Sequence, residues 1–164
     1  LAAHAPRARI VATDISAAAL AMAGRQVARH RLAPRIEFRR ADLFAVTDGG
    51  PPLGRFDIII SNPPYIDDAG RARLDPEIRL YEPEIALAGG CDGLDFFRAI
   101  AGGAGEHLEL DGGRGGSEVI VEIGAGQANA VVAIFNRMLT DAGLQRTSVI
   151  NDLDAIPRVV RVRP

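Results

Sequence analysis

The chain has 164 residues, of which 48% are hydrophobic and 24% charged, and its formal net charge is −2. The length suits one domain of about 150 residues, and the ordinary composition excludes a disordered or fibrous protein. No apolar run approaches the ~18 residues that a membrane span needs, and the weak net charge argues against a surface that gathers nucleic acid. The single cysteine, Cys91, excludes a disulfide framework, and the three scattered histidines form no metal-ligand pattern.

The first third of the chain predicts a strand, a helix and a second strand. Residues 9–13 are a short β-branched run that predicts a strand, and Asp14 follows it directly. Ser16 is expected to cap a helix over residues 17–31, which carry an apolar stripe at helical spacing. The alternating residues 36–40 predict the second strand.

The middle of the chain contains a strand, a short motif and a long polar segment. Residues 56–61 (FDIIIS) are a nearly continuous apolar run, which indicates a strand covered on both faces. Asn62-Pro63-Pro64-Tyr65 comes directly after it. Residues 66–90 are polar and interrupted by prolines, and loops of that length are usually functional or disordered.

The last third predicts helices, a turn and three strands. The expected elements are a helix over 93–101 that extends toward Leu110, a turn over 111–116, a strand over 118–123, a helix over 127–142 that stops at Gly143, and closing strands over 145–151 and 158–162. The strand–helix alternation predicts an α/β fold with a mainly parallel sheet. The two closing strands have no helix between them, which suggests an antiparallel pair at one edge.

The motif at residues 62–65 is the strongest chemical signal. Ligands of open α/β sheets bind beyond the carboxyl ends of the strands, where this motif is expected to lie. A conjugated nitrogen is a poor nucleophile, and the Asn62 side-chain oxygen and the Pro63 carbonyl could accept hydrogen bonds from both of its N–H groups. The prolines fix the backbone, and Tyr65 offers a flat face for stacking. The alternative is a proline-stiffened turn.

This motif resembles that of the class I (Rossmann-like) S-adenosylmethionine-dependent amino-methyltransferases. Further segments are similar to the HemK/PrmC family, which methylates a glutamine side chain in peptide chain release factors: Arg79-Leu80-Tyr81-Glu82-Pro83, Ala86-Leu87-Ala88-Gly89-Gly90, Val121-Glu122-Ile123-Gly124 with Gln127, and Pro157-Arg158-Val159-Val160. The resemblance implies a cytoplasmic enzyme without a metal. Asn62 and Pro63 would be catalytic, and they would form the acceptor site together with Pro64 and Tyr65.

The resemblance also implies a cofactor site for S-adenosylmethionine. A carboxylate only accepts hydrogen bonds, so Asp14 could bind the ribose hydroxyls and Asp42 the adenine amino group. Leu43, with the neighbouring Phe44, could pack on the adenine ring, and Asn62 completes the expected cofactor contacts. Helix capping by Asp14 and a plain loop role for Asp42 are the alternatives.

Two other segments have competing interpretations. Residues 122–127 (EIGAGQ) look like a nucleotide-binding loop but lack the third glycine of that pattern, which favours a structural strand, turn and helix. Arg79, Tyr81 and Glu82 could order the long segment over an acceptor peptide, or could belong to a solvated loop with one ion pair.

The first motif of the family, a glycine-rich loop after its first strand, is not found in the chain. We therefore expect residues 1–164 to be a methyltransferase catalytic domain that is incomplete at the N-terminus and lacks its first strand and a helical N-terminal domain. Two parallel strands would then have unpaired edges, and the chain would bind the cofactor poorly. The alternative functions are a nucleic-acid amino-methyltransferase and an inactive fragment, and the weak charge favours a protein substrate, without direct nucleic-acid or membrane binding.

Overall fold

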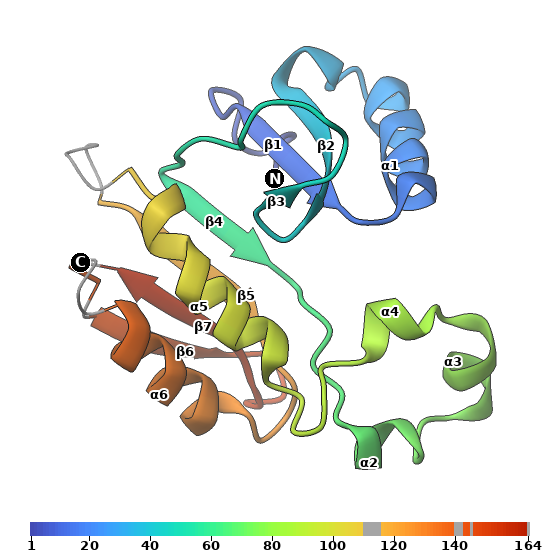
Figure 1. Ribbon diagram of the computed structural model, residues 1–164, viewed down its shortest axis with the longest axis vertical. Coiled ribbons are helices and arrows are strands. Elements are labelled where there is room, and N and C mark those ends of the chain that lie inside the picture. The colour runs from blue at the N-terminus through green and yellow to red at the C-terminus, as the bar shows by residue number, and fades with distance from the viewer. Residues whose placement is uncertain (110–115, 140–142, 145, 164) are drawn as a thin grey trace. The chain divides into compact units, whose positions relative to one another are not determined.

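The computed structural model describes residues 1–109, 116–139, 143–144 and 146–163. The chain divides into two compact units, Leu1–Gly54 and Arg55–Pro164. Each unit has its own sheet, with three strands in the first and four in the second (Figure 1). The predicted turn over residues 111–116 and the end of the helix predicted over 127–142 lie largely outside the described residues.

The first unit is a small sheet with one helix beside it. Its elements are β1 (Ile10–Asp14), α1 (Ala17–Arg29), the 3-10 helix η1 (Ala33–Arg35), β2 (Ile36–Asp42) and β3 (Ala45–Val46). β1 and β2 are parallel, and β3 pairs antiparallel with the end of β2. The Ser16 side chain accepts a hydrogen bond from Ala19 N at 3.2 Å, so the predicted helix cap is confirmed.

The second unit is a mixed four-stranded sheet with two long helices. Its elements are β4 (Ile58–Ser61), α2 (Asp68–Arg71), α3 (Pro76–Tyr81), α4 (Glu84–Leu87), α5 (Asp95–His107), β5 (Glu118–Glu122), α6 (Ala128–Leu139), β6 (Arg146–Asn151) and β7 (Pro157–Arg163). The strand order is β4-β5-β7-β6, in which β4 and β5 are parallel and both pairs made by β7 are antiparallel. The α/β fold with an antiparallel C-terminal edge is therefore confirmed.

Most of the buried apolar side chains belong to the second unit. α5 and α6 pack against each other, and α6 packs on β6 and β7. The fully buried large side chains are Phe97, Phe135, Ile100, Leu108, Ile123, Leu139, Leu144, Val119, Val121, Val131, Val160 and Val162. This core fixes β5 in the sheet. The turns that form the candidate site come directly after β5 and after its neighbour β4.

The edge strands differ in one respect from the sequence prediction. Within the described residues β1 pairs with β2 alone and β4 with β5 alone, so the expectation of two unpaired parallel edges is confirmed. The prediction that the strand over 56–61 is covered on both faces is wrong, because Ile58 and Ile60 are 49% and 53% exposed. Within the described residues β4 is an edge strand with β5 as its one neighbour in the sheet. β5 alone does not cover the side chains of Ile58 and Ile60.

The predicted stop of the second long helix is consistent with the backbone at Gly143. Its φ is +76°, a left-handed value that glycine adopts without a steric cost. The Leu144 backbone N–H donates to the Leu139 carbonyl at 3.1 Å, a bond that satisfies a carbonyl at the end of α6.

Candidate functional site

The turn at residues 62–65 begins where β4 ends. β4 and β5 run parallel, with Ser61 opposite Val121, so the turns that follow the two strands lie at the same edge of the sheet. Asn62 is exposed and Pro63 is buried. The Asn62 side chain has no hydrogen-bond partner in the part of the chain that the structure describes. Its amide oxygen is therefore available to a ligand.

Tyr65 lies closely against three glycines. A Cβ atom added to Gly89 would be 2.8 Å from the Tyr65 Cα, and one added to Gly93 would be 2.5 Å from the Tyr65 carbonyl oxygen. A Cβ atom on Gly124, in the turn after β5, would be 3.0 Å from the Tyr65 ring. These approaches exclude larger residues at Gly89 and Gly93, because the contacted atoms belong to the backbone.

The long segment after the motif closes on itself. Residues predicted as a loop form the three short helices α2, α3 and α4, and the two ends of the segment meet beside Tyr65. The Ile66 N–H donates to the Leu87 carbonyl at 3.0 Å, and the Gly89 N–H donates to the Ile66 carbonyl at 2.8 Å. These bonds bring the end of α4 next to the motif.

A hollow of about 170 Å³ opens at this place. It is lined by Asn62, Pro63, Pro64, Tyr65, Ile66, Ala86 and Leu87. The volume is several times the ~30 Å³ that one water molecule occupies in the liquid, which leaves room for a side-chain amide. The structure therefore brings the four predicted acceptor-site residues together around one hollow. Ala86 and Leu87 of α4, which carry part of the sequence resemblance but are not among the predicted site residues, line it too.

The predicted loop-ordering residues lie beside a second hollow. Arg79 and Glu82 line it, together with Arg71, Leu74, Glu84 and Leu87. The Arg71 guanidinium contacts the Glu84 carboxylate at 2.8 Å and joins α2 to α4. Tyr81 is 83% exposed. The ion pairs that the structure shows in this segment are made by Arg71 and not by the three predicted residues.

The carboxylates predicted for cofactor binding lie at strand ends in the first unit. Asp14 ends β1, and its Oδ1 accepts a hydrogen bond from Ser16 N at 2.7 Å. The helix cap weighed as its alternative role belongs to Ser16 instead. Asp42 ends β2, is exposed, and has no side-chain partner among the described residues. Asp14 pairs with Arg40, which is two residues before Asp42 on the parallel strand β2. The two carboxylates therefore lie at the carboxyl ends of neighbouring strands.

Leu43, the predicted adenine contact, has an unusual backbone conformation. Its φ is +50°, which L-residues other than asparagine and aspartate rarely adopt. It sits in the tight connection where Asp42 pairs with Ala45. Such values persist only where the surrounding structure holds them, and they occur often at ligand sites.

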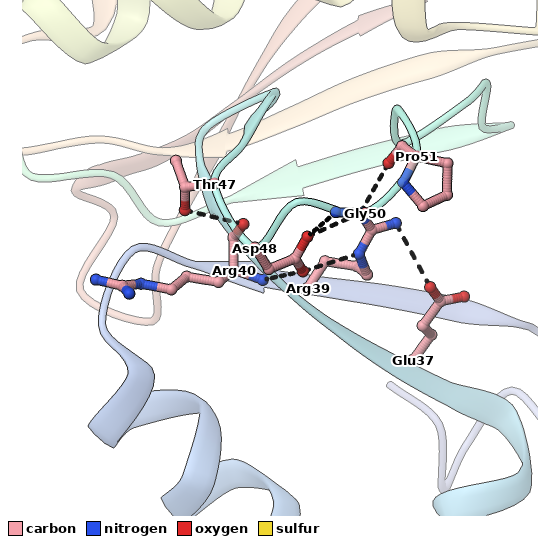
Figure 2. A network of polar contacts seen from close by, with 7 residues as sticks. All are labelled: Glu37, Arg39, Arg40, Thr47, Asp48, Gly50 and Pro51. Atoms are coloured by element: carbon pink, nitrogen blue, oxygen red, sulfur yellow. Dashed lines mark hydrogen bonds and ion pairs between the residues drawn. The ribbon is translucent and has the colours of Figure 1, made fainter.

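A buried arginine network holds the chain that follows this connection. Arg39 on β2 is 8% exposed, and its guanidinium donates to the Asp48 carboxylate at 3.1 and 3.2 Å and to the Pro51 carbonyl at 2.7 Å (Figure 2). The Asp48 carboxylate also accepts from Arg40 N at 3.1 Å and Gly50 N at 2.9 Å. The arginine and these N–H groups hold the pKa of Asp48 well below its usual range.

Several other kinds of site are not found in the described residues. No group of three or more histidine, cysteine, aspartate or glutamate side chains could hold a metal ion there. Cys91 is free and exposed. None of the helices in these residues is long and apolar enough to cross a membrane.

Comparison with known proteins relates this chain to methyltransferases. The family model described as the methyltransferase small domain matches residues 1–75. The release factor glutamine methyltransferase of Cereibacter sphaeroides is 45% identical over 163 residues, which are 99% of this chain and 54% of that protein. Almost the whole chain is thus similar to a release factor glutamine methyltransferase. The ribosomal protein uL3 glutamine methyltransferase of Bradyrhizobium diazoefficiens is 48% identical over 126 residues, 76% of this chain and 36% of that protein.

The chain spans about half the length, or less, of these curated relatives. Among solved structures, the hMettl16 catalytic domain in complex with MAT2A 3′UTR hairpin 1 matches 93% of this chain and 54% of that chain. The TM-score is 0.62 and the identity is 12%, so this likeness shows the fold alone. The structural likeness confirms the α/β fold. The matches to methyltransferases support the methyltransferase interpretation, for which S-adenosylmethionine would be the methyl donor.

The sequence did not reveal three features of the site. These are the Arg39–Asp48 network, the return of α4 to Tyr65 and the contact that the Gln127 side chain makes with the Tyr65 carbonyl. All three join residues that are distant in the sequence or in separate turns, so neither periodicity nor spacing shows them. The one available signal was the glycine series at Gly89, Gly93 and Gly124.

Proposed function

We propose that this chain carries the acceptor site of an enzyme that methylates the side-chain amide nitrogen of a glutamine in a peptide chain release factor. The observation that carries the proposal is the turn at residues 62–65. The Asn62 amide oxygen, which has no partner among the residues that the structure describes, and a rigid proline backbone line a hollow at the carboxyl end of a parallel strand.

The turn suits an amide acceptor because such a nitrogen shares its lone pair with its carbonyl. Asn62 Oδ1 and the Pro63 carbonyl would accept its two hydrogen bonds and favour the tetrahedral nitrogen of the transition state. Pro64 has no N–H that competes for these acceptors. Tyr65 would bound the slot and keep the amide plane in place.

S-adenosylmethionine supplies a methyl group that is already activated on a sulfonium. The residues present fit this group, because Asp42 and the second oxygen of Asp14 are exposed acceptors at the ends of parallel strands, suited to hydroxyl and amino donors. Leu43 would pack on the adenine. The enzyme contributes mainly alignment of the nitrogen with the methyl carbon, and after transfer the nitrogen releases one proton.

A second acceptor protein is supported by a specific similarity. The uL3 glutamine methyltransferase of Bradyrhizobium diazoefficiens is 48% identical over 126 residues. Both relatives are named for glutamine methylation, so the acceptor group would be the same while the protein that carries it differs. We favour the release factor because that relative matches almost the whole chain, and we place the reaction in the cytoplasm, without direct nucleic-acid binding.

The test is a methylation assay with the complete gene product. The enzyme is incubated with S-adenosylmethionine and either a release factor or ribosomal protein uL3, and peptide mass spectrometry locates the methyl group. We expect one methyl group on a glutamine side chain of the release factor. Methylation of uL3 alone would replace the proposed substrate, and a methyl group on neither protein would refute the proposed function.

A further inference from the structure

We propose that Gln127 is a positioning residue that holds the turn at residues 62–65 in the shape that amide methylation requires. This inference rests on the proposed function and concerns the same site. Gln127 lies in the turn between β5 and α6. The sequence predicts a structural strand, turn and helix there and gives this residue no role in the site.

The side-chain amide of Gln127 joins three separate turns. Its Nε2 donates to the Tyr65 carbonyl at 2.9 Å and to the Gly93 carbonyl at 3.2 Å. Its Oε1 accepts from the Gly124 N–H at 2.9 Å. Both protons of the amide are therefore used on carbonyls that lie 62 and 34 residues away in the sequence, and the oxygen fixes the orientation of the group.

Gln127 holds the far end of the turn, and the sheet holds the near end. Ser61, directly before Asn62, is paired with Val121 in the parallel ladder. Between these two anchors, Pro63 and Pro64 have fixed φ angles. Few backbone rotations remain free between Asn62 and Tyr65, and the bond to the Tyr65 carbonyl restricts them further.

The glycines around Tyr65 point to the same role. Gly93 has a φ of +74°, and a Cβ there would be 2.5 Å from the Tyr65 oxygen and 2.8 Å from Gln127 Nε2. A Cβ on Gly124 would be 2.8 Å from Gln127 Oε1. Glycine at positions 93 and 124 thus leaves the space that the Gln127 amide needs to reach the Tyr65 carbonyl.

The side chain of Gln127 is not needed to begin α6. Its backbone N–H donates to the Gly124 carbonyl at 3.2 Å, and its carbonyl accepts from Val131 N at 3.0 Å. The main chain thus forms the start of the helix by itself. The three side-chain bonds serve the contact with the neighbouring turns, and a misplacement of about 1 Å at a catalytic site can cost ~10²-fold in rate.

Gln127→Glu separates the bond that the side-chain oxygen accepts from the two bonds that the side-chain nitrogen donates. The variant keeps an acceptor for Gly124 N but presents an oxygen, in place of the N–H donors, to the Tyr65 and Gly93 carbonyls. Gln127→Met removes all three bonds at similar length. Gln26→Glu and Gln26→Met, on the exposed face of α1, are the matched controls.

The first measurement reads Tyr65 directly and needs no activity. The chain has two tyrosines and no tryptophan, so Tyr81→Phe leaves Tyr65 as the only strong fluorophore of the 164-residue chain. Gln127→Glu in this background should increase the quenching of Tyr65 by acrylamide, because the ring loses its fixed place against Gly124. The Gln26 variants should leave the quenching unchanged.

The second measurement separates positioning from folding in the complete gene product, with Tyr81 intact. For Gln127→Glu we expect kcat/KM for the acceptor protein to fall about ten- to a hundredfold, while the affinity for S-adenosylmethionine changes less than about twofold. Unchanged quenching, or changed quenching with unchanged kcat/KM, would overturn the proposal. If the wild-type enzyme methylates no glutamine, the proposed function fails, and the quenching result still decides whether Gln127 holds Tyr65.

Discussion

The side chains that define the site are exposed polar groups held by rigid backbone. Asn62 and Asp42 have no hydrogen-bond partner among the described residues, and each directly follows or ends a parallel strand. Such groups contribute little to folding, because water satisfies them as well as the protein does. Both groups lie at the carboxyl ends of parallel strands, which is where ligands of such sheets bind, and this placement supports the proposed roles in binding.

At the scale of single residues we expect Asp42→Ala to weaken cofactor binding without affecting the fold. A hydrogen bond to a charged acceptor contributes ~1.5–3 kcal/mol, so the Kd for S-adenosylmethionine should rise roughly tenfold or more. Isothermal titration of the complete gene product measures this value. Asp154→Ala, in an exposed turn of the other unit, is the control, and an equal Kd for Asp42→Ala and Asp154→Ala would remove Asp42 from the cofactor site.

At the scale of elements, the Arg39–Asp48 network links β2 to the chain beyond β3 (Figure 2). The pKa of Asp48 is lower in the folded chain than in the unfolded one, where it is about 3.9. The folded state therefore binds fewer protons, and the pair stabilises the fold above about pH 4. This contribution is lost as the pH falls below that value toward the folded pKa.

Asp48→Asn should lower the stability of β2 at neutral pH and reduce its dependence on acid. We expect the hydrogen-exchange protection of the β2 amides, corrected for intrinsic rates, to fall in the wild type between about pH 6 and pH 3. In Asp48→Asn the protection of the β2 amides should already be lower at pH 6 and should change less between pH 6 and pH 3. Asp154→Asn should behave as the wild type does, and an acid response of Asp48→Asn that equals the wild-type response would contradict this account.

Much of the element order was predictable because local signals agree with the fold. Ser16 caps α1 as expected, and the FDIIIS run forms β4 at its carboxyl half. The exposure of Ile58 and Ile60 was not predictable, because the sequence does not show which strand stands at an edge. The helices α2–α4 were missed because each spans six residues or fewer, too short for a periodic pattern.

The candidate site was predictable in its residues but not in its supports. The turn at 62–65 is contiguous, so its chemistry can be read from four letters. Gln127 and Gly93 contact Tyr65, although they lie 62 and 28 residues from it in the sequence. A single sequence does not show that residues so far apart are close in space. The nucleotide-loop pattern of residues 122–127 does not indicate the contact that the Gln127 side chain makes with the Tyr65 carbonyl.

At the scale of the whole molecule, the two compact units bury very different amounts of apolar surface. In Leu1–Gly54 the buried apolar residues are Ala2 and Ala41, and α1 has none. In Arg55–Pro164 the core includes Phe97, Phe135 and the inward side chains of β5 and β7. Burial of apolar surface is the main stabilising contribution to folding, so the second unit should be the more stable.

We therefore expect hydrogen exchange to distinguish the two units of the 164-residue chain. Amides of β5 and β7 should exchange only through global opening of their unit, and those of β1 and β2 through openings of lower free energy. The difference should be at least about tenfold in exchange rate, which corresponds to ~1.4 kcal/mol. Equal protection in β1 and β5 would show that the first unit buries more than the structure indicates.

In the proposed reaction, Asn62 holds the acceptor nitrogen during methyl transfer. The most direct test is the rate of glutamine methylation by the complete gene product and by Asn62→Ala, at saturating S-adenosylmethionine, with Asn129→Ala on α6 as the control. Loss of one preorganised hydrogen-bonding group of this kind costs ~10²–10³-fold in kcat, and we predict a loss of that size for Asn62→Ala alone. Methylation of the same glutamine by Asn62→Ala at the wild-type rate would contradict the account.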